Sequence, residues 1–154
     1  MGKSGPAYVM TPDETLGWAY LQAKVIKGVL TWNTPLGRVS VDRLRDHVKA
    51  RVRYQHGRVA VTEEVTTNGY VAQTPVSLTQ ARLFTMDKTA QHQILILCLK
   101  AIRFADRTHT DSFGYTRKLL WQYPGQLSAR NLGQQDVLPI DAQIRVKVHL
   151  RGEG

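Results

Sequence analysis

Apolar and polar residues alternate on both sides of His56-Gly57, and this alternation most constrains how the chain can fold. A tight turn at His56-Gly57 pairs apolar residues across two strands, Tyr54 with Val59 and Val52 with Val61. The other face of the same pair then carries Arg51, Arg53, Gln55, Arg58 and Thr62. The pattern therefore predicts an antiparallel hairpin with one apolar and one cationic face.

Three further segments have features of strands. Ile144 to Leu150 alternates apolar residues with Arg145, Lys147 and His149, which predicts a strand with one cationic face. Asn68-Gly69 is typical of a second tight turn, so residues 50–74 are predicted to form a three-stranded antiparallel meander. The alternation around Leu21 to Val25 predicts a half-buried strand within Trp18–Trp32.

Two segments are predicted to be helices. Val41, Leu44 and Val48 fall on one stripe after Ser40, a good N-cap, which predicts a short amphipathic helix over Ser40–Ala50. Residues 89–107 form a continuous apolar face on a helical wheel, which favours a helix over a buried strand. Ser77 and Gln80 fit a capping box before that helix. Cys98 lies on its apolar face and is expected to be a buried, inert thiol.

Predicted strands and helices come in separate blocks, which indicates an α+β fold and not a parallel α/β fold. We expect a single domain over residues 15–154, with a mostly antiparallel sheet and two or three packed helices. Residues 1–14 are polar and contain Gly and Pro, so they are expected to form a flexible N-terminal arm.

The sequence contains no pattern of residues that points to catalysis. The five histidines are scattered and there is one cysteine, so no metal site is expected. Glu63 and Glu64 would lie on opposite faces of a strand and cannot form a catalytic dyad. His109 to Ser112 reads better as a solvated loop than as a triad. We therefore expect a non-enzymatic protein without a cofactor. The alternative at this point is an enzyme whose site is assembled from residues distant in the sequence.

The chain is strongly basic, with 21 Lys and Arg against 12 Asp and Glu, a net charge of +9. This excess indicates a polyanionic partner, either nucleic acid or a ribonucleoprotein, or an anionic membrane surface. The alternative is a basic protein with no such partner. The longest apolar run, Ile94 to Leu99, is too short to span a membrane, and residues 1–10 do not form a signal peptide. A lone cysteine favours a reducing compartment.

Two groups of residues are candidates for ligand binding. Arginine suits phosphate because its planar guanidinium group donates two hydrogen bonds to one anion. The predicted polyanion-binding residues are Arg43, Arg45, Lys49, Arg51, Arg53 and Arg58. A second cluster mixes aromatic and basic residues and could stack on bases or anchor an interface: Tyr115, Arg117, Lys118, Trp121 and Tyr123.

The segment Leu21-Gln22-Ala23-Lys24-Val25-Ile26-Lys27-Gly28, followed by Val41-Asp42-Arg43-Leu44, resembles the matrix proteins of rhabdoviruses. The resemblance implies a viral structural protein that coats a ribonucleoprotein and self-assembles as a homo-oligomer. It would be found in the virion, or in the cytoplasm or nucleus of the host cell. The alternative function is a monomeric nucleic-acid-binding regulator.

Overall fold

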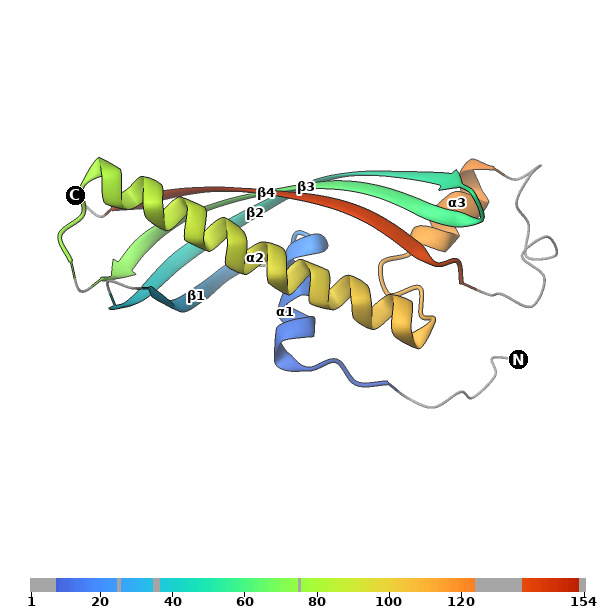
Figure 1. Ribbon diagram of the computed structural model, residues 1–154, viewed down its shortest axis with the longest axis horizontal. Coiled ribbons are helices and arrows are strands. Elements are labelled where there is room, and N and C mark those ends of the chain that lie inside the picture. Colours follow the sequence, from blue (N-terminus) through green and yellow to red (C-terminus); the bar gives the residue numbers. More distant parts are fainter. Residues whose placement is uncertain (1–7, 25, 35–36, 75, 124–136, 153–154) are drawn as a thin grey trace.

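The computed structural model describes residues 8–24, 26–34, 37–74, 76–123 and 137–152. Within these residues, three helices and four strands follow one another as α1 (Pro12–Leu21), β1 (Ile26–Thr34), β2 (Gly37–Gln55), β3 (Arg58–Gln73), α2 (Gln80–Thr108), α3 (Tyr115–Gln122) and β4 (Ile140–Gly152) (Figure 1). The strands form one sheet in the order β1-β2-β3-β4, in which only the β3–β4 pair is parallel. The predicted α+β domain with a mostly antiparallel sheet is confirmed.

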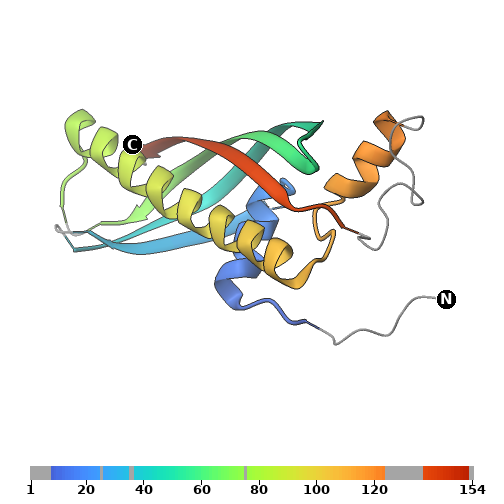
Figure 2. The same cartoon turned by 45° about the vertical axis from the view of Figure 1, so that its right-hand side comes forward.

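The sheet buries one face and leaves the other open. Along β3 the side chains of Val59, Val61 and Val65 are buried, whereas the intervening Arg58 and Thr62 are exposed. The helices supply the cover on the buried face, with α2 running beside the sheet along most of its length (Figures 1 and 2). Because burial is one-sided, period-two alternation decides which residues are available to a partner.

The predicted hairpin and the late strand are confirmed. Tyr54 pairs with Val59 and Val52 pairs with Val61 across the His56-Gly57 turn. His56 and Gly57 both have positive φ, as the mirror-image turns of hairpins require. In β4, Val148 and Leu150 are buried and the residues between them are exposed.

The predicted helix over Ser40–Ala50 is wrong, because these residues lie within β2. A β-bulge between Asp42 and Arg45 puts one extra residue into β2 opposite β3. The bulge brings both Val41 and Leu44 onto the buried face, although they are three residues apart. A bulged strand has thus reproduced the spacing of an amphipathic helix.

The predicted turn at Asn68-Gly69, and with it the three-stranded meander, is also wrong, because both residues lie inside β3. Gly69 is nevertheless required at its position. A Cβ atom there would lie 2.6 Å from Cγ1 of Val41 and 2.9 Å from Cδ2 of Leu44. The two side chains that the bulge brings together therefore fill the space beside Gly69.

The predicted strand over Trp18–Trp32 is wrong in its first half, which belongs to α1. The helix starts with a capping box in which Thr11 and Glu14 bond to each other's backbone N–H, with Pro12 in the first turn. The helix α1 thus begins within residues 1–14, which were predicted to form a flexible arm. Of that predicted arm, residues 1–7 lie outside the described part of the chain. Gly17 lets α1 approach α2, since a Cβ there would lie 1.9 Å from the carbonyl oxygen of Leu97.

The predicted helix over residues 89–107 is confirmed as part of α2, a helix of 29 residues. It starts earlier than predicted, and its N-cap is Thr79 and not Ser77: Thr79 Oγ1 accepts a hydrogen bond from the Arg82 N–H at 3.2 Å. Cys98 is fully buried, as expected. Of the helices in the described ranges, none has both the length and the apolar character needed to cross a membrane.

Polar side chains of α2 satisfy the free edge of β4. Asp87 accepts a hydrogen bond from the Leu150 N–H at 2.9 Å, and Gln91 accepts one from the Val148 N–H at 3.2 Å. At the other end of the strand, Asp106 accepts a hydrogen bond from the Ile140 N–H at 3.1 Å. The long helix therefore lies along β4 and accepts hydrogen bonds from three of the backbone N–H groups at its outer edge.

We expect Gly69→Ala to lower the free energy of unfolding by about 1–3 kcal/mol, because the added methyl group overpacks the space between Val41 and Leu44. The control is Asn68→Thr, which places a good strand former at an exposed strand position and should change stability by less than about 0.5 kcal/mol. Urea unfolding measures both changes. A large loss with Asn68→Thr would instead favour a turn at this position.

Candidate functional site

The open face of the sheet is cationic. Residues paired across neighbouring strands share a face, so the rows Arg53–Ala60–Asp141, Arg51–Thr62–Gln143 and Lys49–Glu64–Arg145 all lie on it. Among the residues whose side chains are described, nine Lys and Arg occupy this surface against three acids, Asp42, Glu64 and Asp141, an excess of six positive charges. We call it the cationic sheet face; its basic residues are Arg38, Arg45, Lys49, Arg51, Arg53, Arg58, Arg145, Lys147 and Arg151.

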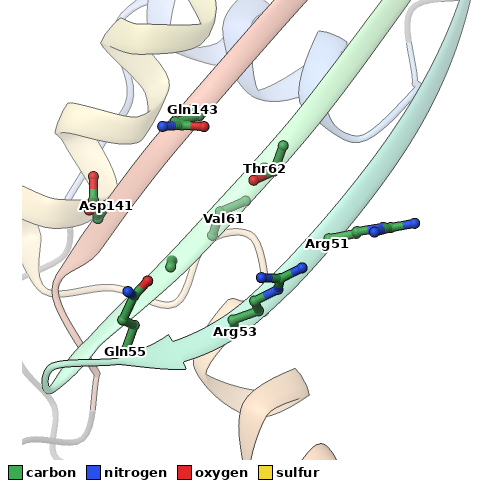
Figure 3. Close-up of a pocket in the computed structure, with 8 residues that line it drawn as sticks. Arg51, Arg53, Gln55, Val61, Thr62, Asp141 and Gln143 are labelled. Atoms are coloured by element: carbon green, nitrogen blue, oxygen red, sulfur yellow. The ribbon is translucent and has the colours of Figure 1, made fainter.

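Two hollows on this face are lined by its cations. One, of about 300 Å³, lies toward the hairpin turn, and Figure 3 shows its residues arising from three adjacent strands: Arg51 and Arg53 from β2, Thr62 from β3, and Asp141 and Gln143 from β4. The other, of about 510 Å³, is lined by Arg45, His149 and Arg151. Each hollow therefore presents two guanidinium groups to solvent.

Most of these cations have no acidic partner within the described ranges. Lys147 Nζ lies 3.0 Å from a carboxylate oxygen of Glu64, and this contact lowers the pKa of Glu64. Arg45, Arg51 and Arg53, by contrast, form no ion pair with any described residue. Their positive charge is thus available to an external anion.

The structure brings together five of the six predicted polyanion-binding residues: Arg45, Lys49, Arg51, Arg53 and Arg58. Arg45 and Lys49 were expected on one side of a helix. They lie four residues apart in a strand instead, and period two again places them on one side. The sixth, Arg43, belongs to the bulge, and its side chain lies outside the described part of the chain.

Sequence analysis missed that Arg145, Lys147 and Arg151 extend the same surface. The alternation in β4 showed that this strand has a cationic face, but nothing showed which strand lies next to it. Parallel pairing of β4 with β3 brings the two basic segments together. Residues about 100 positions apart in the sequence therefore form one surface.

The aromatic-basic cluster does not form one surface. Tyr115 is buried and donates a hydrogen bond to Glu63, and its ring stacks on Phe113 with centroids 5.2 Å apart. It is therefore a core residue that cannot stack on a base. Tyr123 is half-buried, whereas Arg117, Lys118 and Trp121 are exposed on α3.

Two acids, the half-buried Asp46 and the buried Glu63, lie on the face of the sheet that the helices cover. Burial raises the pKa of Asp46 to about 7, although a hydrogen bond from Thr67 partly opposes the shift. Burial likewise raises the pKa of Glu63 to about 6, while the Tyr115 hydroxyl and the charge of Lys118 act in the opposite direction. One carboxylate oxygen of each acid is buried and has no hydrogen-bond partner among the described residues.

The described residues do not cluster as a metal site would require, since no group of three His, Cys, Asp or Glu side chains could hold an ion. The predicted separation of Glu63 and Glu64 is confirmed, because Glu63 is buried and Glu64 lies on the cationic sheet face. Asp111 has a structural use, because its carboxylate accepts hydrogen bonds from the N–H groups of Thr116 and Arg117 in the first turn of α3.

Comparison with known proteins gives two similarities. The family model described as spore germination B3/GerAC like, C-terminal, matches residues 7–154. The crystal structure of the GerBC protein superposes with a TM-score of 0.77 over 92% of this chain, at 11% sequence identity. The chain spans 46% of the length of that protein, so the likeness shows a shared fold for this part alone. No curated protein sequence matches significantly.

The family match overturns the resemblance to rhabdovirus matrix proteins, and with it the predicted viral structural function and the virion or host-cell location. The alternative of a nucleic-acid-binding regulator finds no support in these similarities either. The resemblance rested on a strand followed by a basic helix, and the structure has a helix and a bulged strand there. The prediction of a non-enzymatic protein is consistent with this family.

The buried acids predict that stability falls as pH rises. Their pKa values are raised in the folded state, so between about pH 4 and about pH 7 the unfolded chain binds fewer protons than the folded chain. The free energy of unfolding should therefore decrease across this range. Asp46→Asn should flatten the decrease, and Asp13→Asn, at an exposed carboxylate, should leave it in place. Chemical unfolding at several pH values measures the effect; stability that rises with pH would contradict it.

Proposed function

Because the chain belongs to the spore germination B3/GerAC-like family, we propose that it serves in germination as a non-enzymatic docking domain. The cationic sheet face is the docking surface, and the anionic headgroups of a phospholipid membrane surface are its partner. The observation that carries this proposal is the gathering of nine described Lys and Arg residues on the sheet face that none of the three described helices covers.

The arrangement of charge fits a surface better than a single small anion. From Arg45 to Arg53 the cations of β2 extend over about 25 Å, with further cations two strands away on β4. Such a spread can contact several phosphate groups at once, and each Lys or Arg near an anionic membrane contributes about 1 kcal/mol. Arginine strengthens the contact because its guanidinium group bonds a phosphate in bidentate fashion.

The fold supplies a rigid platform for this contact. Residues of the opposite face, such as Val52, Val61 and Val65, are buried in the core, so the strands that carry the arginines are held in place. The exposed arginines themselves contribute little to folding because they form no ion pairs with described residues. Affinity and stability are therefore separable by mutation.

We expect the protein to bind vesicles that contain phosphatidylglycerol and not vesicles of pure phosphatidylcholine. Arg51→Gln with Arg53→Gln should weaken this binding roughly tenfold or more, because two charges are lost from the contact. Binding should also weaken as salt rises, since the Debye length is already about 10 Å at 0.1 M. Vesicle cosedimentation measures both effects, and a melting curve should show an unchanged fold.

The matched control is Arg103→Gln with Arg117→Gln, which removes the same charge from α2 and α3, outside the cationic sheet face. This pair should weaken binding much less. Equal weakening by both pairs would show that net charge alone governs binding. That result, or no binding to anionic vesicles at low salt, would overturn the proposal.

A further inference from the structure

A second pocket lies on the opposite side of the sheet, under the end of α1 and the start of α3. It has a volume of about 260 Å³, and its apolar wall includes Leu21, Val48, Val52 and Phe113. Glu63, Tyr115 and Lys118 are the ionisable residues that line it. Figure 1 shows α3 near the end of β2, where these segments meet. The pocket thus combines apolar side chains with several polar groups in its wall, as small-molecule sites do.

Glu63 is the unusual member of this lining. Its side chain is only 2% exposed, and one of its carboxylate oxygens accepts the hydrogen bond from the Tyr115 hydroxyl. The other oxygen, Oε2, is buried and has no hydrogen-bond partner among the described residues. A buried carboxylate oxygen without a donor is costly, so a donor that displaced the side chains covering it and reached it from the pocket would gain a strong, charge-assisted bond.

The surroundings hold this acceptor in a fixed position. The Tyr115 ring is itself buried and stacked on Phe113, which holds its hydroxyl group against Glu63. Glu63 belongs to the middle of β3, paired with Ala50 on one side and Ile144 on the other. Burial raises its pKa to about 6, and the charge of Lys118 in the same wall acts in the opposite direction, so the pocket holds one acid and one base beside its apolar side chains.

We propose that this pocket binds a small organic ammonium ion with a short apolar chain. The ammonium group donates a hydrogen bond to Oε2 of Glu63, and the chain packs against Val48 and Val52. The volume suits a compact molecule, since a single water occupies about 30 Å³ in the liquid. Lys118 at the pocket wall repels such a ligand in part. The site lies across the sheet from the cationic sheet face and does not depend on it.

The test uses butylammonium and its neutral counterpart butanol as probes, followed by amide chemical shifts in NMR. Butylammonium should give saturable shifts at Val52, Glu63 and Tyr115, and butanol should bind roughly tenfold more weakly, because a charged hydrogen bond is lost. Shifts spread over the exposed acids, or equal binding of the two probes, would overturn the proposal.

Two variants with opposite expected effects complete the test. Glu63→Gln keeps the shape of the side chain and should abolish the preference for butylammonium over butanol. Lys118→Gln removes a repelling charge from an exposed position and should strengthen butylammonium binding roughly two- to fivefold. A preference that survives Glu63→Gln in a folded protein rejects Glu63 as the acceptor. Weaker binding in Lys118→Gln contradicts the assignment of a cationic ligand.

Discussion

The extra residue in β2 between Asp42 and Arg45 determines the character of both faces of the sheet. A shift of one residue moves every later side chain of a strand to the opposite face. With the bulge, Leu44, Val48 and Val52 contact the core, and the arginines that follow point away from it. Without it, four basic residues of β2 (Arg45, Lys49, Arg51 and Arg53) would face the helices. Gly69 on the neighbouring strand makes room for this irregularity, so the bulge and the glycine together set which side chains of β2 face the core beyond Asp42.

Elements with an uninterrupted period could be predicted from sequence. The β2–β3 hairpin, β4 and most of α2 each show one period over many residues, and each was found where expected. The errors fall where the period is broken or where a short signal was overlooked. The bulge in β2 gave a strand the apolar spacing of a helix. The helix α1 has no clear apolar face, so only its start, Thr11-Pro12-Asp13-Glu14, could have identified it.

The candidate surface was predictable within one hairpin but not across the sheet. The basic residues of β2 could be placed on one face from their spacing, whereas the addition of Arg145 and Lys147 depended on strand order, which the periodicity of a single sequence does not reveal. The pocket proposed to bind an ammonium ion was harder to predict from the sequence. Its acid, Glu63, occupies a position where alternation calls for an apolar residue, and it meets Tyr115 only through the packing of α3. The one signal in the sequence was an acid at a position where the alternation along the strand predicts an apolar residue.

Coverage of β4 by α2 makes the two borders of the sheet chemically unequal. On the β4 side, Asp87 and Gln91 already accept two of the N–H groups that a foreign strand would need, and α2 lies beside this edge. Growth of the sheet by strand exchange or fibril-like stacking is therefore disfavoured at that edge. An added strand would find a more open edge at β1. The inner edge of β1 pairs with β2, and no described strand pairs with its outer edge.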